Sequence, residues 1–374
     1  MQTACVYHHL MFTANMSREP SACHTGHLAP RGLQNDGNYC YVNSVAQALL
    51  GDPALVRAVK SLTPEARHAG PVTQATYKLV QQLSRPGSQP LLARGYLEFI
   101  GCKYGQQHLR EQQDAHHFLS DLLYGLMEEA EGKQLSNAVK RGYFGQIIYE
   151  VSRKNNISSN LQDTIGFSLD VEISKVTTID QLLVNFFRAE EISPNLFQKA
   201  YIKKLPETLI LHMKFFKYDA LRGAIKIGQH FEVPSKMQLK KEWIQNDSYT
   251  SEDLTYRLVA VVYHSGERIS SGHYTTVGFN MKFHKWFSFN DNTAFPIDAE
   301  NFKHFEGSRT PYLLVYRQVK WLADINIPPI KGNFSDRQVH NSRIMKVQDD
   351  IWNNMFPPMP KRKPKQKRRA GKNA

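Results

Sequence analysis

The segment GLQNDGNYCYVNS, Gly32 to Ser44, decides how the rest of the sequence is interpreted. A turn rich in glycine and asparagine leads directly into apolar residues at helical spacing, which predicts a helix that begins near Cys40. The unpaired N–H groups and the dipole at a helix start favour a thiolate. The Asn35 amide precedes the thiol closely enough to meet the Cys40 N–H across an oxyanion. Two interpretations stay open: Cys40 is a nucleophile, or it is a small buried residue that begins an ordinary helix.

A second polar segment lies far downstream, where the strand GHYTTVGF is followed by KWFSFN and an aspartate. A hairpin with a four-residue loop, 280–283, pairs residue 279 with 284 and places Asn290 opposite His273. Such a neighbour holds the imidazole tautomer that accepts a thiol proton. His273 is therefore a candidate base, with Asn290 as its orienting partner and Asp291 as an assisting group. The alternative is a histidine at a strand edge with no polar partner.

The order of the predicted elements indicates an α+β fold. Up to about residue 142 the apolar spacing is mainly helical, with amphipathic segments from Gln74 and from Ala115. Beyond that point, short segments rich in β-branched and aromatic residues alternate with polar ones, which predicts antiparallel strands. A short helix is expected from Ile179 within this part.

The composition is that of an ordinary globular protein whose charge is unevenly distributed. The 374 residues are 41% hydrophobic and 22% charged, and 47 Lys+Arg against 34 Asp+Glu give a net charge of +13. The tail KRKPKQKRRAGKNA holds eight of the basic side chains between Lys361 and Lys372 and no acid, which leaves only +5 for residues 1–360. It is predicted to be disordered. It is either a nuclear-import or RNA-contacting segment or a solvated tail.

Targeting and metal-binding patterns narrow the class further. No run approaches the roughly 18 apolar residues of a membrane span, and the start of the sequence lacks a signal-peptide pattern. We therefore expect a cytoplasmic or nuclear protein that is not secreted and not in a membrane. Since no two of Cys5, Cys23, Cys40 and Cys102 lie two to four residues apart, we expect no structural zinc site and no cofactor.

Together these segments resemble the Cys box and the His box of the ubiquitin-specific proteases, which are papain-like deubiquitinases. The family patterns G-L-x-N-x-G-N-x-C-Y-x-N-S, G-H-Y and W-x-x-F-[ND]-D read GLQNDGNYCYVNS, GHY and WFSFND here. The blocks EQQDAHHFLSDLL, LPETLILHMKFFKY, YRLVAVVYHSG and PYLLVYR also resemble family blocks, in the family order.

The resemblance implies a papain-like fold with a helical thumb and with a β-rich palm and fingers that lack a zinc ribbon. It covers about residues 31–318, which we predict to be the catalytic domain. On either side we predict a loose arm at 1–30, a poorly packed extension at 319–360 and the basic disordered tail at 361–374.

Carried over by position, the resemblance makes Cys40 the nucleophile, His273 the general base, Asn290 the third member and Asn35 the oxyanion donor. It implies hydrolysis of the isopeptide or peptide bond after the last glycine of ubiquitin through a thioester on Cys40. The implied partners are ubiquitin and ubiquitinated proteins, and no cofactor is implied.

The resemblance also implies contacts with the tail of ubiquitin, from Gln113, Asp114 and His117 on one helix and from Gly272 and Tyr274 on one strand. Asp114 is expected to pair with an arginine of that tail. The family has an acidic residue where this sequence has His117, and an arginine where it has Phe215. These departures keep open the hypothesis of a catalytically weak or inactive ubiquitin-binding scaffold. The basic tail keeps open a third, an RNA-associated adaptor that uses the protease fold.

Overall fold

The computed structural model describes residues 28–85, 87–130, 133–154, 156–171, 178–219, 223–226, 233–268, 271–297 and 309–322. All of them belong to the first of two units into which the chain divides, residues 1–333. The predicted arm up to residue 27, the extension beyond residue 322 and the basic tail lie outside the described residues.

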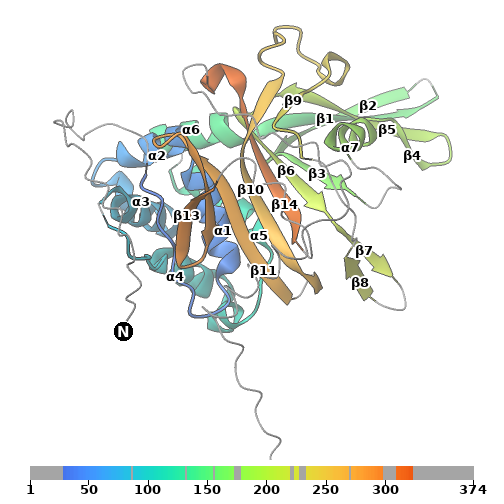
Figure 1. The fold of residues 1–374 in the computed structure, drawn as a ribbon. Coiled ribbons are helices and arrows are strands. Elements are labelled where there is room, and N and C mark those ends of the chain that lie inside the picture. The colour runs from blue at the N-terminus through green and yellow to red at the C-terminus, as the bar shows by residue number, and fades with distance from the viewer. Residues whose placement is uncertain are drawn as a thin grey trace, which may run out of the picture. The chain divides into compact units, whose positions relative to one another are not determined.

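Helices form the N-terminal part of this unit, as the apolar spacing predicts, and we call them the thumb (Figure 1). They are α1 (Cys40–Leu50), α2 (Pro53–Lys60), α3 (Pro71–Ser84), α4 (Arg94–Tyr104), α5 (Ala115–Glu129) and α6 (Gln134–Tyr143), with the short η1 (Ala66–His68) and η2 (Gln106–Arg110). The helix predicted from Gln74 begins earlier because Pro71 suits the first helical position, where no N–H is needed. Asp52 and Asp114 cap α2 and α5 by accepting backbone N–H bonds.

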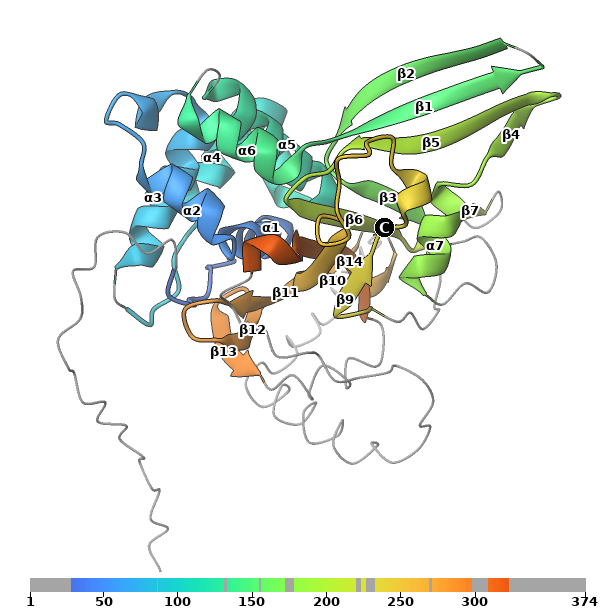
Figure 2. The same cartoon turned by 90° about the horizontal axis from the view of Figure 1, so that it is seen from above.

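Two large sheets follow the helices in the described part of the chain (Figure 2). The palm has the order β13-β12-β11-β10-β14-β6-β3, with β9 beside β10, and the fingers have the order β2-β1-β5-β4. The palm strands are β3 (Phe167–Asp170), β6 (Thr208–Lys214), β9 (Lys236–Gln238), β10 (Thr255–Arg268), β11 (Ser271–Asn280), β12 (Lys285–Asn290), β13 (Thr293–Ile297) and β14 (Arg309–Gln318). The finger strands are β1 (Gly145–Arg153), β2 (Asn156–Thr164), β4 (Glu190–Ser193) and β5 (Leu196–Lys204).

Smaller elements complete the described part. They are α7 (Ile179–Phe186), the hairpin of β7 (Phe216–Asp219) and β8 (Gly223–Lys226), η3 (Lys241–Trp243) and η5 (Val319–Leu322). Only β3 and β6 pair in parallel among the described strands, and every other pair is antiparallel. The predicted α+β class, with helices first and antiparallel strands later, is therefore confirmed.

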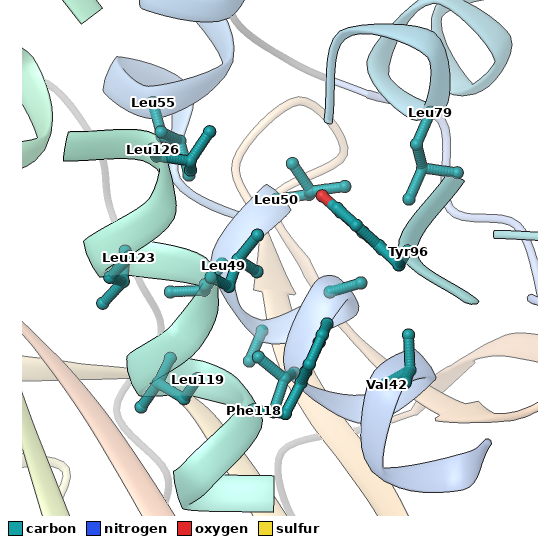
Figure 3. Close-up of a cluster of buried hydrophobic side chains, with 14 of the residues drawn as sticks. Val42, Leu49, Leu50, Leu55, Leu79, Tyr96, Phe118, Leu119, Leu123 and Leu126 are labelled. Atoms are coloured by element: carbon teal, nitrogen blue, oxygen red, sulfur yellow. The ribbon is translucent and has the colours of Figure 1, made fainter. Parts of the chain in front are cut away.

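Helix α1 lies in the centre of the apolar core, enclosed by the other thumb helices and the palm. Figure 3 shows Val42 and Leu49 of α1 beside Phe118 of α5 and Tyr96 of α4, all of them buried. On its other side α1 packs against β11. Because α1 is enclosed in this way, its first residue is fixed between the thumb and the palm.

The hairpin of β11 and β12 turns one residue later than predicted, at 281–284 in place of 280–283, so its register differs by two residues. Asn280 still belongs to the ladder, and its side-chain oxygen accepts two N–H bonds from the turn. His284 ends the turn with a φ of 50°. A shift of two residues leaves every side chain on its predicted face, because side chains alternate with a period of two.

Candidate active site

Cys40 is the first residue of α1 and is 5% exposed. Burial raises the pKa of its thiol to about 11, and the charge of Asp291 acts in the same direction. Backbone hydrogen bonds from Tyr274, from Tyr41 and from Cys40 itself lower the pKa, in part through the N–H groups at the helix start. At neutral pH the thiol is therefore protonated in this state, and its activation requires a base.

His273 lies near the start of β11, and Asn290 ends β12. The two remain on one face but are offset along the strands, and Nε2 of His273 is 2.7 Å from Oδ1 of Asn290. An amide oxygen can only accept a hydrogen bond, so Nε2 of His273 carries the proton. Nδ1 then keeps a lone pair that can accept the thiol proton. Neither ring nitrogen is hydrogen-bonded to Cys40 within the described part of the chain. Such bonds often form only when substrate is bound.

Asp291 links this base to the segment before α1. It adopts a left-handed conformation, with φ 43°, directly after β12. Its Oδ2 accepts a 2.8 Å hydrogen bond from Nδ2 of Asn35 and lies 3.9 Å from Nε2 of His273. The Asn35 oxygen in turn accepts the N–H groups of Gly37 and Tyr39. This fixes the amide, whose second N–H donates to no other group in the described part of the chain.

Asn43 is a member of this cluster that the sequence reasoning missed. It is 3% exposed on α1, and its Nδ2 donates to Oδ1 of Asp291 at 2.8 Å. The same nitrogen lies 3.2 Å from the carbonyl oxygens of Leu33 and Gln34. An amide side chain one turn after the cysteine, on a helix whose other residues are mostly apolar, is the signal that would have found it.

The residues predicted to contact substrate from the thumb already have partners in the protein. Asp114 accepts the backbone N–H of His117 at 2.9 Å through Oδ1, and its Oδ2 accepts the hydroxyl of Tyr312. Nε2 of Gln113 donates to the carbonyl oxygen of His108 at 3.2 Å. Asp114 therefore lies where the start of α5 meets β14.

The strand residues predicted to contact substrate lie at the same junction of thumb and palm. The backbone N–H of Gly272 donates to the side-chain oxygen of Gln112. A Cβ at Gly272 would lie 2.2 Å from Nε2 of His264, so only glycine fits there. Tyr274 is 7% exposed, and its ring centre is 5.5 Å from that of Tyr312.

The two departures from the family pattern lie in different environments. The side chain of His117 is 60% exposed, and its Nε2 is 3.2 Å from the hydroxyl of Tyr104 and 3.9 Å from Asp121. Phe215 is fully buried. The substitution at Phe215 therefore affects packing inside the palm, whereas His117 faces the surface on which substrate contacts were predicted.

An open cleft of about 490 Å³ lies between the thumb and the fingers. The cleft is lined on one side by His116 and Tyr124 of α5 and on the other by Tyr149 and Gln198 of the fingers. Lys214, at the end of β6, also lines it. Among the described residues, no group of His, Cys, Asp or Glu side chains is arranged to hold a metal ion. Within the same part of the chain, no helix has the length and apolar character needed to span a membrane.

Residues 31–316 match the family described as ubiquitin carboxyl-terminal hydrolase. The match covers most of the sequence, so the chain belongs to this family of cysteine-type deubiquitinases. The resemblance stated from the sequence motifs is therefore confirmed.

Individual curated proteins of the family are also similar to this chain. Ubiquitin carboxyl-terminal hydrolase 10 of Rattus norvegicus is 25% identical over 393 residues, which cover 79% of this chain and 49% of the relative. The same protein of Xenopus tropicalis is 24% identical over 389 residues, 79% of this chain and 48% of the relative. The chain thus spans about half the length of these relatives. The segments GYFGQIIYEVS and FSLDVEI resemble the same member, in agreement with this result.

A solved structure has a similar fold. It is the SAGA Ubp8/Sgf11/Sus1/Sgf73 DUB module bound to ubiquitin aldehyde, with a TM-score of 0.65 and 20% identity. The likeness covers 80% of this chain and 70% of that chain. At this identity the likeness concerns the arrangement of thumb, palm and fingers.

Proposed function

We propose that the chain is a deubiquitinating thiol protease, which hydrolyses the isopeptide or peptide bond after the last glycine of ubiquitin. The observation that carries the proposal is the placement of Cys40 at a buried helix start, beside a strand pair on which His273 is held 2.7 Å from Asn290. Family membership and the ubiquitin aldehyde bound to the similar structure support ubiquitin as the partner.

The reaction begins when Nδ1 of His273 takes the proton of the Cys40 thiol. The thiolate attacks the carbonyl carbon of ubiquitin's last glycine, and the oxyanion receives hydrogen bonds from Asn35 and from the N–H of Cys40. The imidazolium then protonates the leaving lysine amine. Water, deprotonated by His273, hydrolyses the thioester and releases ubiquitin.

The body of ubiquitin would occupy the cleft between α5 and the fingers, and its tail would pass the junction of thumb and palm. There the tail must displace two internal contacts, that of Gln112 with Gly272 and that of Tyr312 with Asp114. Narrow passage beside Gly272 would favour the side-chain-free end of ubiquitin.

A ubiquitin probe with a C-terminal vinyl electrophile tests the proposal. We expect the probe to label the wild-type chain covalently and to fail with Cys40→Ser. Cys102→Ser is the matched control, because Cys102 is an exposed cysteine outside the site and its loss should leave labelling intact. Wild-type protein that binds ubiquitin but is never labelled would favour the alternative, an inactive ubiquitin-binding scaffold.

The basic tail between Lys361 and Lys372 is proposed to direct the chain to nuclei or to contact RNA. Deletion of residues 361–374 should shift a tagged protein away from nuclei, and an unchanged distribution together with unchanged RNA recovery would leave the tail as a solubilising segment.

A further inference from the structure

The cluster around Asp291 contains one buried side chain that takes no part in the proposed reaction. Asn43 is 3% exposed, and its amide donates to Oδ1 of Asp291 at 2.8 Å. The other carboxylate oxygen accepts the Asn35 amide, also at 2.8 Å. The carboxylate is thus held between two amide donors, one on α1 and one on the segment that precedes it.

This arrangement fixes the orientation of the Asp291 carboxylate relative to two groups, the Asn35 amide and the His273 imidazole. Toward the thiol, it holds the Asn35 amide that would face the oxyanion. Toward the base, it lies 3.9 Å from Nε2 of His273, where a negative charge stabilises an imidazolium. Without Asn43, Asp291 keeps only one amide donor and is free to rotate away from one of these two partners.

We infer that Asn43 is a positioning residue that acts through Asp291: it fixes the carboxylate so that Asn35 and His273 are both correctly placed. The inference rests on the proposed function, since it assigns Asn43 a part in that same reaction. Asn43 acts on the reacting atoms only through this carboxylate.

A purely structural role is the competing explanation, because the Asn43 amide also lies 3.2 Å from the carbonyl oxygens of Leu33 and Gln34. Gln47 provides a matched control. It lies one turn further along α1, and its Nε2 donates to the carbonyl oxygen of Arg31 at 2.7 Å. Gln47→Leu therefore removes a bond between the same helix and the same segment without removing a donor to Asp291.

A double-mutant cycle separates the two explanations. Asn43→Leu and Gln47→Leu are each made in the wild-type chain and in Asp291→Asn, and kcat and KM are measured on ubiquitin with a C-terminal fluorogenic amide. We expect Asn43→Leu to lower kcat about tenfold or more in the wild-type background, with KM changed less than about twofold. In the Asp291→Asn background the same substitution should change kcat less than about twofold. Gln47→Leu should have the same small effect in both.

A second readout does not depend on ubiquitin. Cys40 is alkylated with iodoacetamide at pH 8, and its modification is followed by mass spectrometry of the Cys40 peptide. Asn43→Leu should slow this reaction about threefold, because the Asp291 charge is then less offset and disfavours the thiolate more. The effect should vanish in Asp291→Asn. If the wild-type chain does not cleave the ubiquitin amide, the proposed function fails, and this cycle still decides the role of Asn43.

Asn43→Ser is measured in parallel, since its hydroxyl can still donate to a backbone carbonyl but is too short to hold Asp291. Thermal unfolding monitors the folded fraction of every variant, so that Asn43→Ser replaces Asn43→Leu in the cycle if the latter does not fold. Equal effects of the Asn43 substitution in both backgrounds, by both readouts, would overturn the inference and leave Asn43 as a support of the backbone only.

Discussion

The Cys40 thiol illustrates how burial and a helix start compete at one residue. Burial raises its pKa to about 11, which outweighs the backbone N–H groups that lower it. Because only the thiolate reacts, the free enzyme should be poorly reactive near neutral pH. In the proposed reaction, substrate binding must therefore bring Cys40 and His273 together before the chemistry can start.

This state predicts how Cys40 reacts with iodoacetamide in the free protein. The rate should rise with pH up to about 11, since the thiolate fraction grows until the pH passes the thiol pKa. At pH 8, Asp291→Asn should react faster than wild type, because removal of the carboxylate charge lowers that pKa, even though we expect the same substitution to impair catalysis. Mass spectrometry of the Cys40 peptide measures the rate, with the exposed Cys102 as internal reference. A rate that is already constant above pH 8 would contradict the prediction.

At the scale of elements, Asp114 has two roles that one substitution can separate. It caps α5 through a backbone N–H, and its charge is proposed to pair with an arginine of ubiquitin. Asn is as good an N-cap as Asp, and its amide can donate to the Tyr312 oxygen in place of the bond that Asp114 accepts, so Asp114→Asn should leave the free energy of unfolding within about 0.5 kcal/mol of wild type. Loss of the charge should raise KM for ubiquitin substrates about tenfold.

Urea unfolding and steady-state kinetics test both halves of the Asp114 prediction. Asp114→Ala is the comparison, because it removes both cap and charge and should cost about 1 kcal/mol of stability in addition. A KM that is unchanged in Asp114→Asn would place the arginine contact elsewhere.

The contact between α5 and β6 should make the stability of the fold depend on pH. The rings of His116 and His212 stack at 4.1 Å, and burial lowers the pKa of both imidazoles, that of His212 to about 3. Asp114 raises both pKa values, whereas Lys214 lowers both. A neighbouring imidazole also lowers each pKa, that of His117 for His116 and that of His116 for His212. Ser168 also contacts Nδ1 of His212, at 3.1 Å. The folded state thus holds His212 neutral, while the unfolded chain titrates near pH 6.5.

The sign of the effect follows from proton binding. Between pH 6.5 and about 3 the unfolded state binds more protons at His212 than the folded state does. The contribution of His212 to the free energy of unfolding is therefore complete above pH 6.5 and is lost as the pH falls. From pH 7 to pH 5, His212 alone should cost about 2 kcal/mol of unfolding free energy. His212→Phe should reduce the loss measured by urea unfolding, whereas His68→Phe, at an exposed position, should not. Equal losses in both variants would refute the assignment.

The elements also show what the sequence could predict. Helices α1, α3, α5 and α7 were predicted from their apolar spacing, whereas α2, α4 and α6 were not predicted and depend on tertiary packing. The faces of β11 and β12 followed from side-chain alternation, but their register did not, because the Asn280 side chain and the positive φ of His284 determine where the turn closes.

The same limit applies to the site. Motif spacing predicted Cys40 and His273 as nucleophile and base, since that chemistry requires a helix start and a polar strand partner, and these roles stay predictions. The contact of Asn43 with Asp291 joins residues 248 positions apart, which no local pattern encodes. The partners of the predicted substrate residues, Gln112 and Tyr312, depend in the same way on how the thumb meets the palm.

For the molecule as a whole, a buried ion cluster connects the thumb to the palm. Arg317 of β14 contacts Asp52, the cap of α2, at 2.5 Å and Glu207 at 3.4 Å. The hydroxyl of Tyr143 donates to the same Asp52 at 2.8 Å, and Arg141 pairs with Glu207 at 2.7 Å. The thumb carries Cys40 and the palm carries His273, so this cluster helps to hold the two halves of the proposed active site together.

Arg317→Met tests how much this connection contributes. The substitution keeps an unbranched apolar stem but leaves Asp52 and Glu207 without their buried cation, since the side chain of Arg317 is only 6% exposed. It should lower the free energy of unfolding by about 3–5 kcal/mol. Lys320→Met is the matched control, because its pair with Asp253 is 37% exposed on the lysine side and should contribute less than about 1 kcal/mol. Urea unfolding of both variants at pH 7.5 measures the difference, and similar losses in the two would show that the thumb and the palm are held together by apolar packing instead.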